Sequence, residues 1–549
     1  MKKLLHNDHG YTLVFTIGII VIFMVLGLSL MILTSSGIKK NEVRQDTVQS
    51  KDLADKGITY AVNDLQSYLE KTIKNTPMGK TQFNDLLNNT VKVTCPQNII
   101  IPGEKNNKTN VCIEKVEQIS TVEQDRYKRL VTFKSTGQVN GRDTIVRSKV
   151  IIGTDAIPDQ LRYAVSTNKG GNLFLHGGVE IQGDIKTDGN LIIAKNATWM
   201  SGSTAKWEDS VGARIVKETK SVNPKIIMRD KDQMIYTIDG SSSTVNYNSH
   251  IAGSFNNNYG KISPYLSNSA PLVEKKLFNT QNLAIVTKSL TPDNINVITK
   301  VEDKINESAD YNYYDGDVSV TSTNNPIKNY TRDKTILIAK KEKKSSFNFS
   351  CFCWKEEETG KYLKANLTIN ANSNINLRGS YYINGDLSIT NTNLKSDAII
   401  YVKGDVNIRD STLMGIDPNS TLIIFADGNI SISNISEYSS YNNPSTIKGF
   451  FYSNSDMIMY GVGSNIRLSG GISSRRLILT ALRGDVSSTT KPISVQNKLD
   501  ATGLPFYPSR LKVTYDENLI KQYTSFQRDE KEEFITQLNE PEYIERSNN

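Results

Sequence analysis

The chain has 549 residues, a length that predicts two to four domains. A total of 65 Lys and Arg against 57 Asp and Glu gives a formal net charge of +8, and charges of both signs alternate throughout. The sequence shows no concentrated basic face of the kind that nucleic-acid binders have, so no specific nucleic-acid partner is predicted. With only four Cys and four His, the chain offers little material for a metal centre, a bound cofactor or His-based catalysis, so none is predicted.

The segment from Tyr11 to Leu33 contains no Lys, Arg, Asp, Glu or His. A helix needs about 20 apolar residues to cross a bilayer core, so this segment predicts one transmembrane span. The part before the span is very short, MKKLLHNDHG, and the part after it is large and rich in Asn, Ser and Thr. This asymmetry favours a single-pass protein of the cell membrane with its N-terminus inside and its bulk extracytoplasmic.

Gly10 directly precedes the apolar segment, whereas a secretory signal peptide has its cleavage site after the apolar part. The arrangement resembles the class III signal of type IV prepilins and pseudopilins, which a dedicated prepilin peptidase cuts after a Gly. The resemblance implies a leader over residues 1–10, cleavage between Gly10 and Tyr11, and N-methylation of the new first residue. The alternative is an uncleaved N-terminal signal anchor.

Phe15 stands where major pilins carry a Glu, five residues into the mature chain. In those pilins the Glu is thought to pair with the terminal amine of a neighbouring subunit during assembly. A helix without this charge is easily held in lipid. The departure therefore argues against bulk polymerisation and, within the resemblance, favours a minor or tip subunit.

Apolar residues continue at three- and four-residue spacing from about Gln49, with charged residues between them. Thr76-Pro77-Met78-Gly79 ends this pattern. Residues 11–78 are thus predicted as a transmembrane and amphipathic stem helix. The small residues of its second half resemble the helix that follows the span in PilX-like minor pilins.

Residues 79–153 are predicted as a small antiparallel β-sheet, in the order that pilins show, with a hairpin at Asn140-Gly141. Cys95 and Cys112 enclose a turn-rich segment on the oxidising side of the membrane, where a disulfide between them is favoured. Cys351 and Cys353 are two apart on an expected strand and are awkward to join directly. They are interpreted as free or structural, with pairing elsewhere or a redox pair as alternatives.

Short alternating strands between Gly-containing corners fill residues 154–203 and again residues 364–490. A Gly-Asp/Asn-apolar corner recurs at Gly385, Gly404, Gly428 and Gly484. This repetition predicts a right-handed parallel β-helix whose coils bury one inward row of Ile, Leu and Val. Gly is expected to provide a positive φ at these corners. A β-sandwich is the alternative.

The remaining segments interrupt or follow this pattern. Residues 204–363 are interpreted as an insertion from the solenoid, residues 491–527 as a segment capping its open end, and residues 528–549 as a charged, flexible tail. The overall fold class is α+β, with a long helix and small sheet followed by a mainly β solenoid.

Polysaccharide hydrolysis requires a pair of carboxylates across a groove, and the repeats offer four candidates: Asp386, Asp405, Asp410 and Asp427. Asp386 and Asp405 belong to the recurring corner, so a turn role accounts for them and no catalytic residue is predicted. We expect a structural, pilin-like surface protein that meets prepilin peptidase, other pilin-like subunits and a surface or polysaccharide ligand. The alternatives are a permanently anchored adhesin, a self-assembling scaffold of the bactofilin type and a polysaccharide-acting enzyme.

Overall fold

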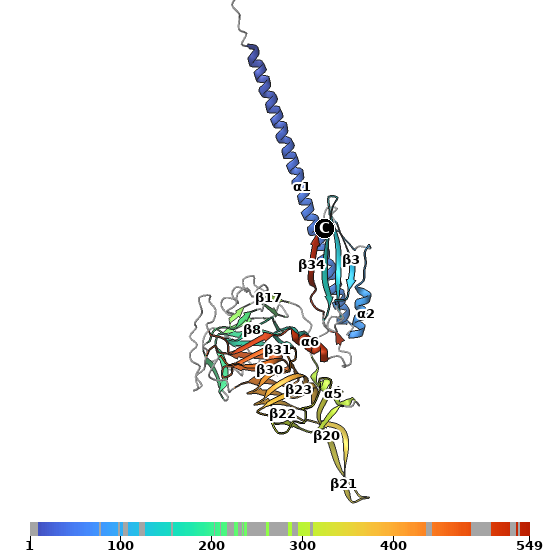
Figure 1. Ribbon diagram of the computed structural model, residues 1–549, viewed down its shortest axis with the longest axis vertical. Coiled ribbons are helices and arrows are strands. Elements are labelled where there is room, and N and C mark those ends of the chain that lie inside the picture. The colour runs from blue at the N-terminus through green and yellow to red at the C-terminus, as the bar shows by residue number, and fades with distance from the viewer. Residues whose placement is uncertain are drawn as a thin grey trace, which may run out of the picture. The chain divides into compact units, whose positions relative to one another are not determined.

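The structure is a computed structural model and consists of two compact units. Unit 1 comprises residues 1–156 and 532–549, and unit 2 comprises residues 157–531 (Figure 1). The structure describes residues 9–75, 78–96, 99–102, 108–119, 127–154, 158–201, 204–208, 210–216, 224–228, 233, 235–238, 260–262, 284–287, 295–307, 311–434, 442–484, 507–526, 534–535 and 538–548.

Unit 1 is built on helix α1, which runs from His9 to Asn75. At about 1.5 Å per residue its length is about 100 Å, and it extends well beyond the sheet of the same unit (Figure 1). Its second half is amphipathic, and the side chains that face the sheet are fully buried, among them Ala54, Ile58 and Val62. The predicted stem helix is therefore present as one continuous element.

The sheet of unit 1 has the strand order β2-β3-β4-β5-β34, and every neighbouring pair is antiparallel. Asn140 and Gly141 both have positive φ and join β4 to β5, as the sequence predicts. The strands are β2 (Ile99–Pro102), β3 (Lys108–Glu117), β4 (Lys128–Val139), β5 (Arg142–Gly153) and β34 (Glu542–Asn548).

Glycine lets α1 lie directly on the sheet. A Cβ at Gly137 of β4 would be 2.0 Å from the Ser50 carbonyl oxygen and 2.7 Å from the Ala54 nitrogen. From the helix side, a Cβ at Gly57 would be 2.7 Å from both hydroxyl oxygens of Ser135 and Thr109. The two backbones approach closely at this crossing only because both positions lack side chains.

Two parts of unit 1 differ from the sequence prediction. Residues 79–153 contain a helix, α2 (Lys80–Thr90), which buries Phe83 and Leu87 beside the sheet. The prediction of a flexible tail over residues 528–549 is also wrong for the described part of this segment, because β34 pairs with β5 and forms the edge of the sheet. The short strand β33 (Phe534–Ile535) pairs with β1 (Met78–Gly79). These pairings satisfy the backbone N–H and C=O groups of the segment. Its charged composition alone does not predict them.

Unit 2 is formed mainly by parallel strand pairs arranged in three rows. The first row follows β18-β20-β23-β25-β28-β30-β31-β6-β9-β14-β17. The second follows β19-β22-β24-β26-β29-β30-β31-β7-β10-β15. The third follows β23-β25-β27-β30-β31-β32-β8-β13.

The bounds of the unit 2 strands are as follows: β6 (Val165–Thr167), β7 (Leu173–Gly177), β8 (Glu180–Gln182), β9 (Ile185–Thr187), β10 (Leu191–Ala194), β11 (Ala197–Ser201), β12 (Thr204–Glu208), β13 (Arg214–Val216), β14 (Lys225–Met228), β15 (Ile235–Ile238), β16 (Gly260–Ile262), β17 (Ala284–Thr287), β18 (Asn312–Asp315), β19 (Val318–Val320), β20 (Thr335–Asn348), β21 (Cys353–Leu363), β22 (Leu367–Asn370), β23 (Asn374–Ile383), β24 (Leu387–Thr390), β25 (Asn393–Val402), β26 (Val406–Arg409), β27 (Thr412–Gly415), β28 (Leu422–Ala426), β29 (Ile430–Ser433), β30 (Ser445–Gly461), β31 (Ile466–Ala481) and β32 (Leu511–Tyr515).

One continuous apolar core lies between the rows and consists mainly of Ile, Leu and Val. A second cluster covers the outer side of the first row, where Tyr382, Tyr401 and Phe425 stack with ring centroids 5.0 and 5.3 Å apart. Helices α5 (Val297–Asn306) and α6 (Asn518–Phe526) bury their apolar residues in this cluster. The helices thus protect an aromatic stripe that the strands expose outward.

The order of strands in space differs from their order in the chain. Strands β6, β7 and β8 pair directly with β31 and β32, so the two predicted solenoid parts adjoin. Strands from 204–363 extend the rows at both ends, so the prediction of a separate insertion is wrong for its described strands. Strand β32 lies between β31 and β8 and does not cap an open end. Residues with the same inward apolar pattern can pair whatever their separation in sequence.

Candidate functional site

The apolar half of α1 is an exposed surface that the described residues of unit 1 leave uncovered. Leu13 and Phe15 are each 65% exposed, and exposed apolar side chains continue to Leu33. One helix in the described part of the chain is long and apolar enough to cross a membrane, and this is α1. A bilayer or a set of similar helices can cover such a surface.

Gly10 and Tyr11, the predicted processing site, lie within the first turn of α1, which begins at His9. The other leader residues, 1–8, lie outside the described residues. Phe15 faces outward on the same helix, so its position in the structure is compatible with contact to lipid or to another helix.

The predicted disulfide between Cys95 and Cys112 is present. It ties the segment after α2 to strand β3. Next to it, the Thr94 hydroxyl accepts a hydrogen bond from the Ile113 backbone N–H at 2.9 Å. In the chain-entropy model, closing a loop of this size stabilises the folded state by about 3 kcal/mol.

The recurring corners form a ladder of side-chain to backbone hydrogen bonds along one edge of unit 2. The Asp386 carboxylate accepts from the Asp405 N–H at 2.8 Å, and the Asp405 carboxylate accepts from the Asn429 N–H at 2.7 Å. The ladder begins with Asp317, which accepts from the Asn366 N–H, and Asn366 in turn accepts from the Asp386 N–H. Each corner side chain thus satisfies the backbone of the next corner.

Three of the four corner glycines are required by close approach and not by backbone conformation. Gly385, Gly404 and Gly428 do not adopt the left-handed region, which corrects the expectation of positive φ at these three corners, whereas Gly484 has a φ of +81° and confirms it there. A Cβ at Gly404 would be 1.9 Å from the Asp386 Oδ1 atom and 2.7 Å from the Gly385 oxygen. Two polar residues at another corner, Asn391 and Asp410, also adopt the left-handed region.

We expect Gly404→Ala to lower the free energy of unfolding of unit 2 by about 1–3 kcal/mol, since the added methyl overlaps the neighbouring corner. Urea unfolding of the full chain, followed by hydrogen exchange in β24 and β26, measures this change. Asn407→Ala is the matched control, because Asn407 is exposed on β26, and its effect should stay within about 0.5 kcal/mol. Equal effects of the two variants would contradict the tight-corner interpretation.

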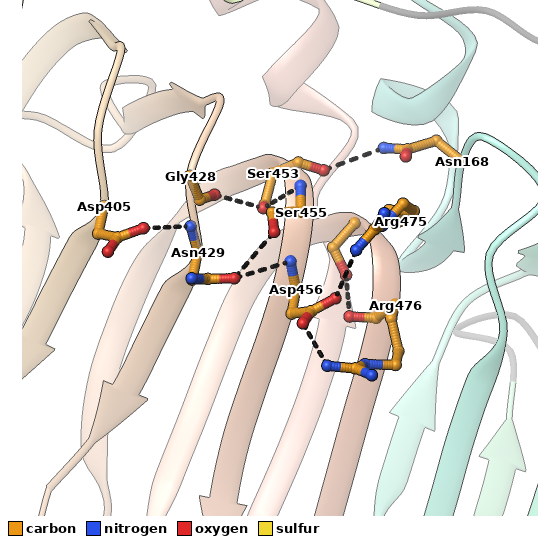
Figure 2. A network of polar contacts seen from close by, with 10 residues as sticks. Asn168, Asp405, Gly428, Asn429, Ser453, Ser455, Asp456, Arg475 and Arg476 are labelled. Atoms are coloured by element: carbon orange, nitrogen blue, oxygen red, sulfur yellow. Dashed lines mark hydrogen bonds and ion pairs between the residues drawn. The ribbon is translucent and has the colours of Figure 1, made fainter. Parts of the chain in front are cut away.

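At the end of the ladder the pattern changes from amides and carboxylates to an ion pair (Figure 2). Asn429 accepts from the Ser455 hydroxyl at 2.9 Å and from the Asp456 N–H at 3.3 Å. The Asp456 carboxylate pairs with Arg476 and lies 3.6 Å from the Arg475 guanidinium. Asn168 donates to the Ser453 carbonyl, so the first chain segment of unit 2 joins the network.

A second cluster of charges lies where β8 meets the strands on either side of it. The Glu180 carboxylate is 3.1 Å from Lys512 of β32, 3.6 Å from Arg483 and 3.8 Å from Arg214 of β13. Arg483 is almost completely buried, and burial lowers the pKa of its guanidinium to about 10. One carboxylate therefore balances several cations at the junction of distant chain segments.

A third group of charges is centred on Lys186. Lys186 of β9 is 1% exposed, and its ammonium donates to the Asp159 carboxylate at 2.7 Å. Its ammonium is also 3.9 Å from Asp188. Because all three groups are buried and mutually paired, this cluster is best explained as a fixed structural contact.

The four candidate carboxylates for hydrolysis have structural partners. Asp386 and Asp405 accept backbone hydrogen bonds, Asp427 accepts from Asn454, and Asp410 lies 3.5 Å from Arg409. His176 is buried and its Nδ1 atom is 2.9 Å from the Thr198 hydroxyl. In the part of the chain that the structure describes, no group of three or more His, Cys, Asp or Glu could hold a metal ion.

Several features of the structure are not predicted by the sequence. The Glu180 cluster joins residues far apart in the chain, and no local signal points to it. Cys351 and Cys353 form a disulfide with each other, which corrects the expectation that they are awkward to join directly and excludes free thiols in this structure. They lie at a chain reversal, where Phe352 has a positive φ, and not side by side on a strand. The exposed aromatic residues around them were visible in the sequence as FNFSCFCW.

No protein-family model matches this chain, and no curated protein matches it. Among solved structures, the competence-associated pilin ComZ from Thermus thermophilus is similar. The two chains are 13% identical, the match covers 92% of this chain and 98% of that one, and the TM-score is 0.25. A TM-score this low does not establish a shared fold, so the similarity carries no weight for fold or function.

Proposed function

We propose that this protein is a membrane-anchored, type IV pilin-like surface protein that acts as a minor pilin or pseudopilin. The observation that carries the proposal is α1, whose exposed apolar half continues without interruption into an amphipathic half packed on an antiparallel sheet. This arrangement suits a subunit that is held in the membrane and can leave it by packing its helix against other helices.

The proposed orientation has the N-terminus in the cytoplasm and both units outside, on the cell surface or in a pilus. The disulfide between Cys95 and Cys112 supports an oxidising location for unit 1. Prepilin peptidase and other pilin-like subunits are the proposed partners. Phe15 in place of the pilin Glu favours a minor position over a bulk one.

Unit 2 is proposed to be a right-handed parallel β-helix that displays side chains for adhesion to a surface or polysaccharide. Three rows of parallel pairs around one apolar core support this architecture. The proposed role is structural and not enzymatic. Its support is that the candidate carboxylates are engaged by backbone N–H groups or by Arg and Asn side chains.

The proposal is tested by the mass of the mature N-terminus, taken from cells with and without prepilin peptidase. A chain that begins at methylated Tyr11 only when the peptidase is present is the expected result. Gly10→Val should block this processing in peptidase-positive cells, while Gly18→Val, in an open part of the same helix, should not. A chain that begins at Met1 in all cells would overturn the pilin-like role and leave a permanently anchored adhesin.

A further inference from the structure

The hairpin of β20 and β21 ends in an aromatic surface that the proposed function does not use. We define the aromatic tip as residues 347–354, FNFSCFCW, which contain no charged side chain. Phe349 and Phe352 are each 80% exposed, and Trp354 is 71% exposed. Three large aromatic side chains left in water at one point form an apolar patch of the kind that marks an interaction site.

The tip projects from the body of unit 2. Only residues 335–338 of β20 pair with β23, and from Lys340 outward its described pairs are with β21 alone. Both strands run out beyond the stacked rows of unit 2 (Figure 1). The surface is thus convex and is presented at the end of a two-stranded arm.

The tip is also held in one shape. The disulfide between Cys351 and Cys353 closes the turn. Phe347 lies at the centre of the cluster, with the rings of Phe349, Phe352 and Trp354 edge-on at centroid distances of 5.1, 5.5 and 5.4 Å. Rigid aromatic groups lose little conformational entropy when they are buried by a partner.

The charges on the arm identify the kind of partner. The register pairs Phe347 with Trp354, Ser346 with Lys355, Ser345 with Glu356 and Lys344 with Glu357. The charge-free end is therefore about three residues deep, or about 10 Å, which matches the 5–10 Å depth at which apolar residues enter a membrane interface. Charged side chains begin at the level of the lipid headgroups.

We propose that the aromatic tip inserts into the interface of a phospholipid bilayer. Trp is favoured at the headgroup boundary because its ring is amphipathic, and the Phe rings are buried below it. Lys343, Lys344 and Lys355 are matched by Glu356, Glu357 and Glu358, with ion pairs from Lys343 to Glu356 and from Lys355 to Glu357. Because these charges balance, insertion depends on aromatic burial and not on anionic lipid.

The test uses the full chain held through α1 in a nanodisc, with Trp199→Phe and Trp207→Phe so that Trp354 is the only tryptophan. Phosphatidylcholine vesicles with brominated acyl chains are then added, and in a second arm the brominated lipid is placed in the nanodisc itself. Quenching of Trp354 in either arm, together with a shift of its emission to shorter wavelength, is the expected result. The two arms distinguish an apposed bilayer from the one that holds α1.

The matched variant is Phe349→Ser with Phe352→Ser, which changes exposed side chains and leaves the core intact. We expect vesicle partitioning to fall at least about tenfold, with an unchanged thermal midpoint. No quenching in both arms, or equal quenching in this variant, would overturn the proposal. So would binding that requires anionic lipid and disappears in high salt. The result is independent of cleavage at Gly10, so it can fail while the pilin-like role stands.

Discussion

Glu180→Gln is expected to lower the free energy of unfolding of unit 2 by about 3–5 kcal/mol, the range for breaking a buried ion pair by removing one partner. The substitution keeps the size of the side chain and removes its charge. Arg483, which is 1% exposed, then remains buried without its carboxylate and next to further cations. The loss should be concentrated where β8 meets β32 and β13, because Glu180 connects these strands.

Urea unfolding of the full chain with hydrogen exchange in β8 and β32 measures the effect. Glu545→Gln is the control, since Glu545 pairs with Lys149 at 2.6 Å while both side chains are about half exposed. An exposed pair of this kind contributes at most about 1 kcal/mol. If the two variants lose the same amount, Glu180 does not hold the junction together.

Acidification should reproduce part of the Glu180→Gln effect. Burial by itself would raise the pKa of the Glu180 carboxyl, but Lys512 and Arg483 together lower it below its ordinary value of 4.5. The folded state thus favours the ionised form, so its stabilisation is present above pH 4.5 and is lost as the pH falls further. Below pH 4.5 the urea midpoint should decline more steeply for the wild type than for E180Q.

Gly137→Ala is expected to separate α1 from its sheet and to destabilise unit 1 by about 3 kcal/mol, near the upper end of the usual range for overpacking. The new methyl would lie 2.0 Å from the Ser50 carbonyl oxygen and 2.7 Å from the Ala54 nitrogen. Both are backbone atoms of a helix, so neither can turn aside as a flexible side chain can. The helix must shift, and the burial of Ala54 and its neighbours is lost with it.

Hydrogen exchange in the second half of α1 and in β4 measures this change in the full chain. Gly37→Ala serves as the control, because nothing lies within 4 Å of a Cβ added there, and Ala favours helix over Gly. Exchange in unit 2 should be unaffected by either variant. Unchanged protection of β4 in Gly137→Ala would show that the helix tolerates displacement and that the close crossing is not required.

The amino-acid sequence alone determined the features that depend on local patterns. The charge-free run after Gly10 predicted an apolar helix, and α1 contains it. Asn140-Gly141 predicted a hairpin because both residues accept positive φ. Cys95 and Cys112 were expected to form a disulfide, and they do. The Gly-Asp corners indicated repeats, because the side-chain pattern of each repeat is set by its own residues.

Only the tertiary structure decided which repeats adjoin. Every inward-facing strand carries a similar apolar pattern, so the sequence cannot distinguish the pairing of β31 with β6 from pairing with a nearer strand. The pairing of β34 with β5 in unit 1 and the position of β32 inside a row are likewise pairings between distant strands that the sequence pattern does not determine. The Glu180 cluster exists only because these distant segments meet.

The tertiary structure also explains why certain residues occupy the corners and the aromatic tip. Gly404 is needed because a carboxylate of the preceding repeat lies against it, which no single repeat contains. Cys351 and Cys353 can bond because the chain reverses between β20 and β21, which an alternating strand pattern does not predict. Local periodicity specifies elements and their faces, whereas contacts between distant elements depend on the free energy of the whole fold.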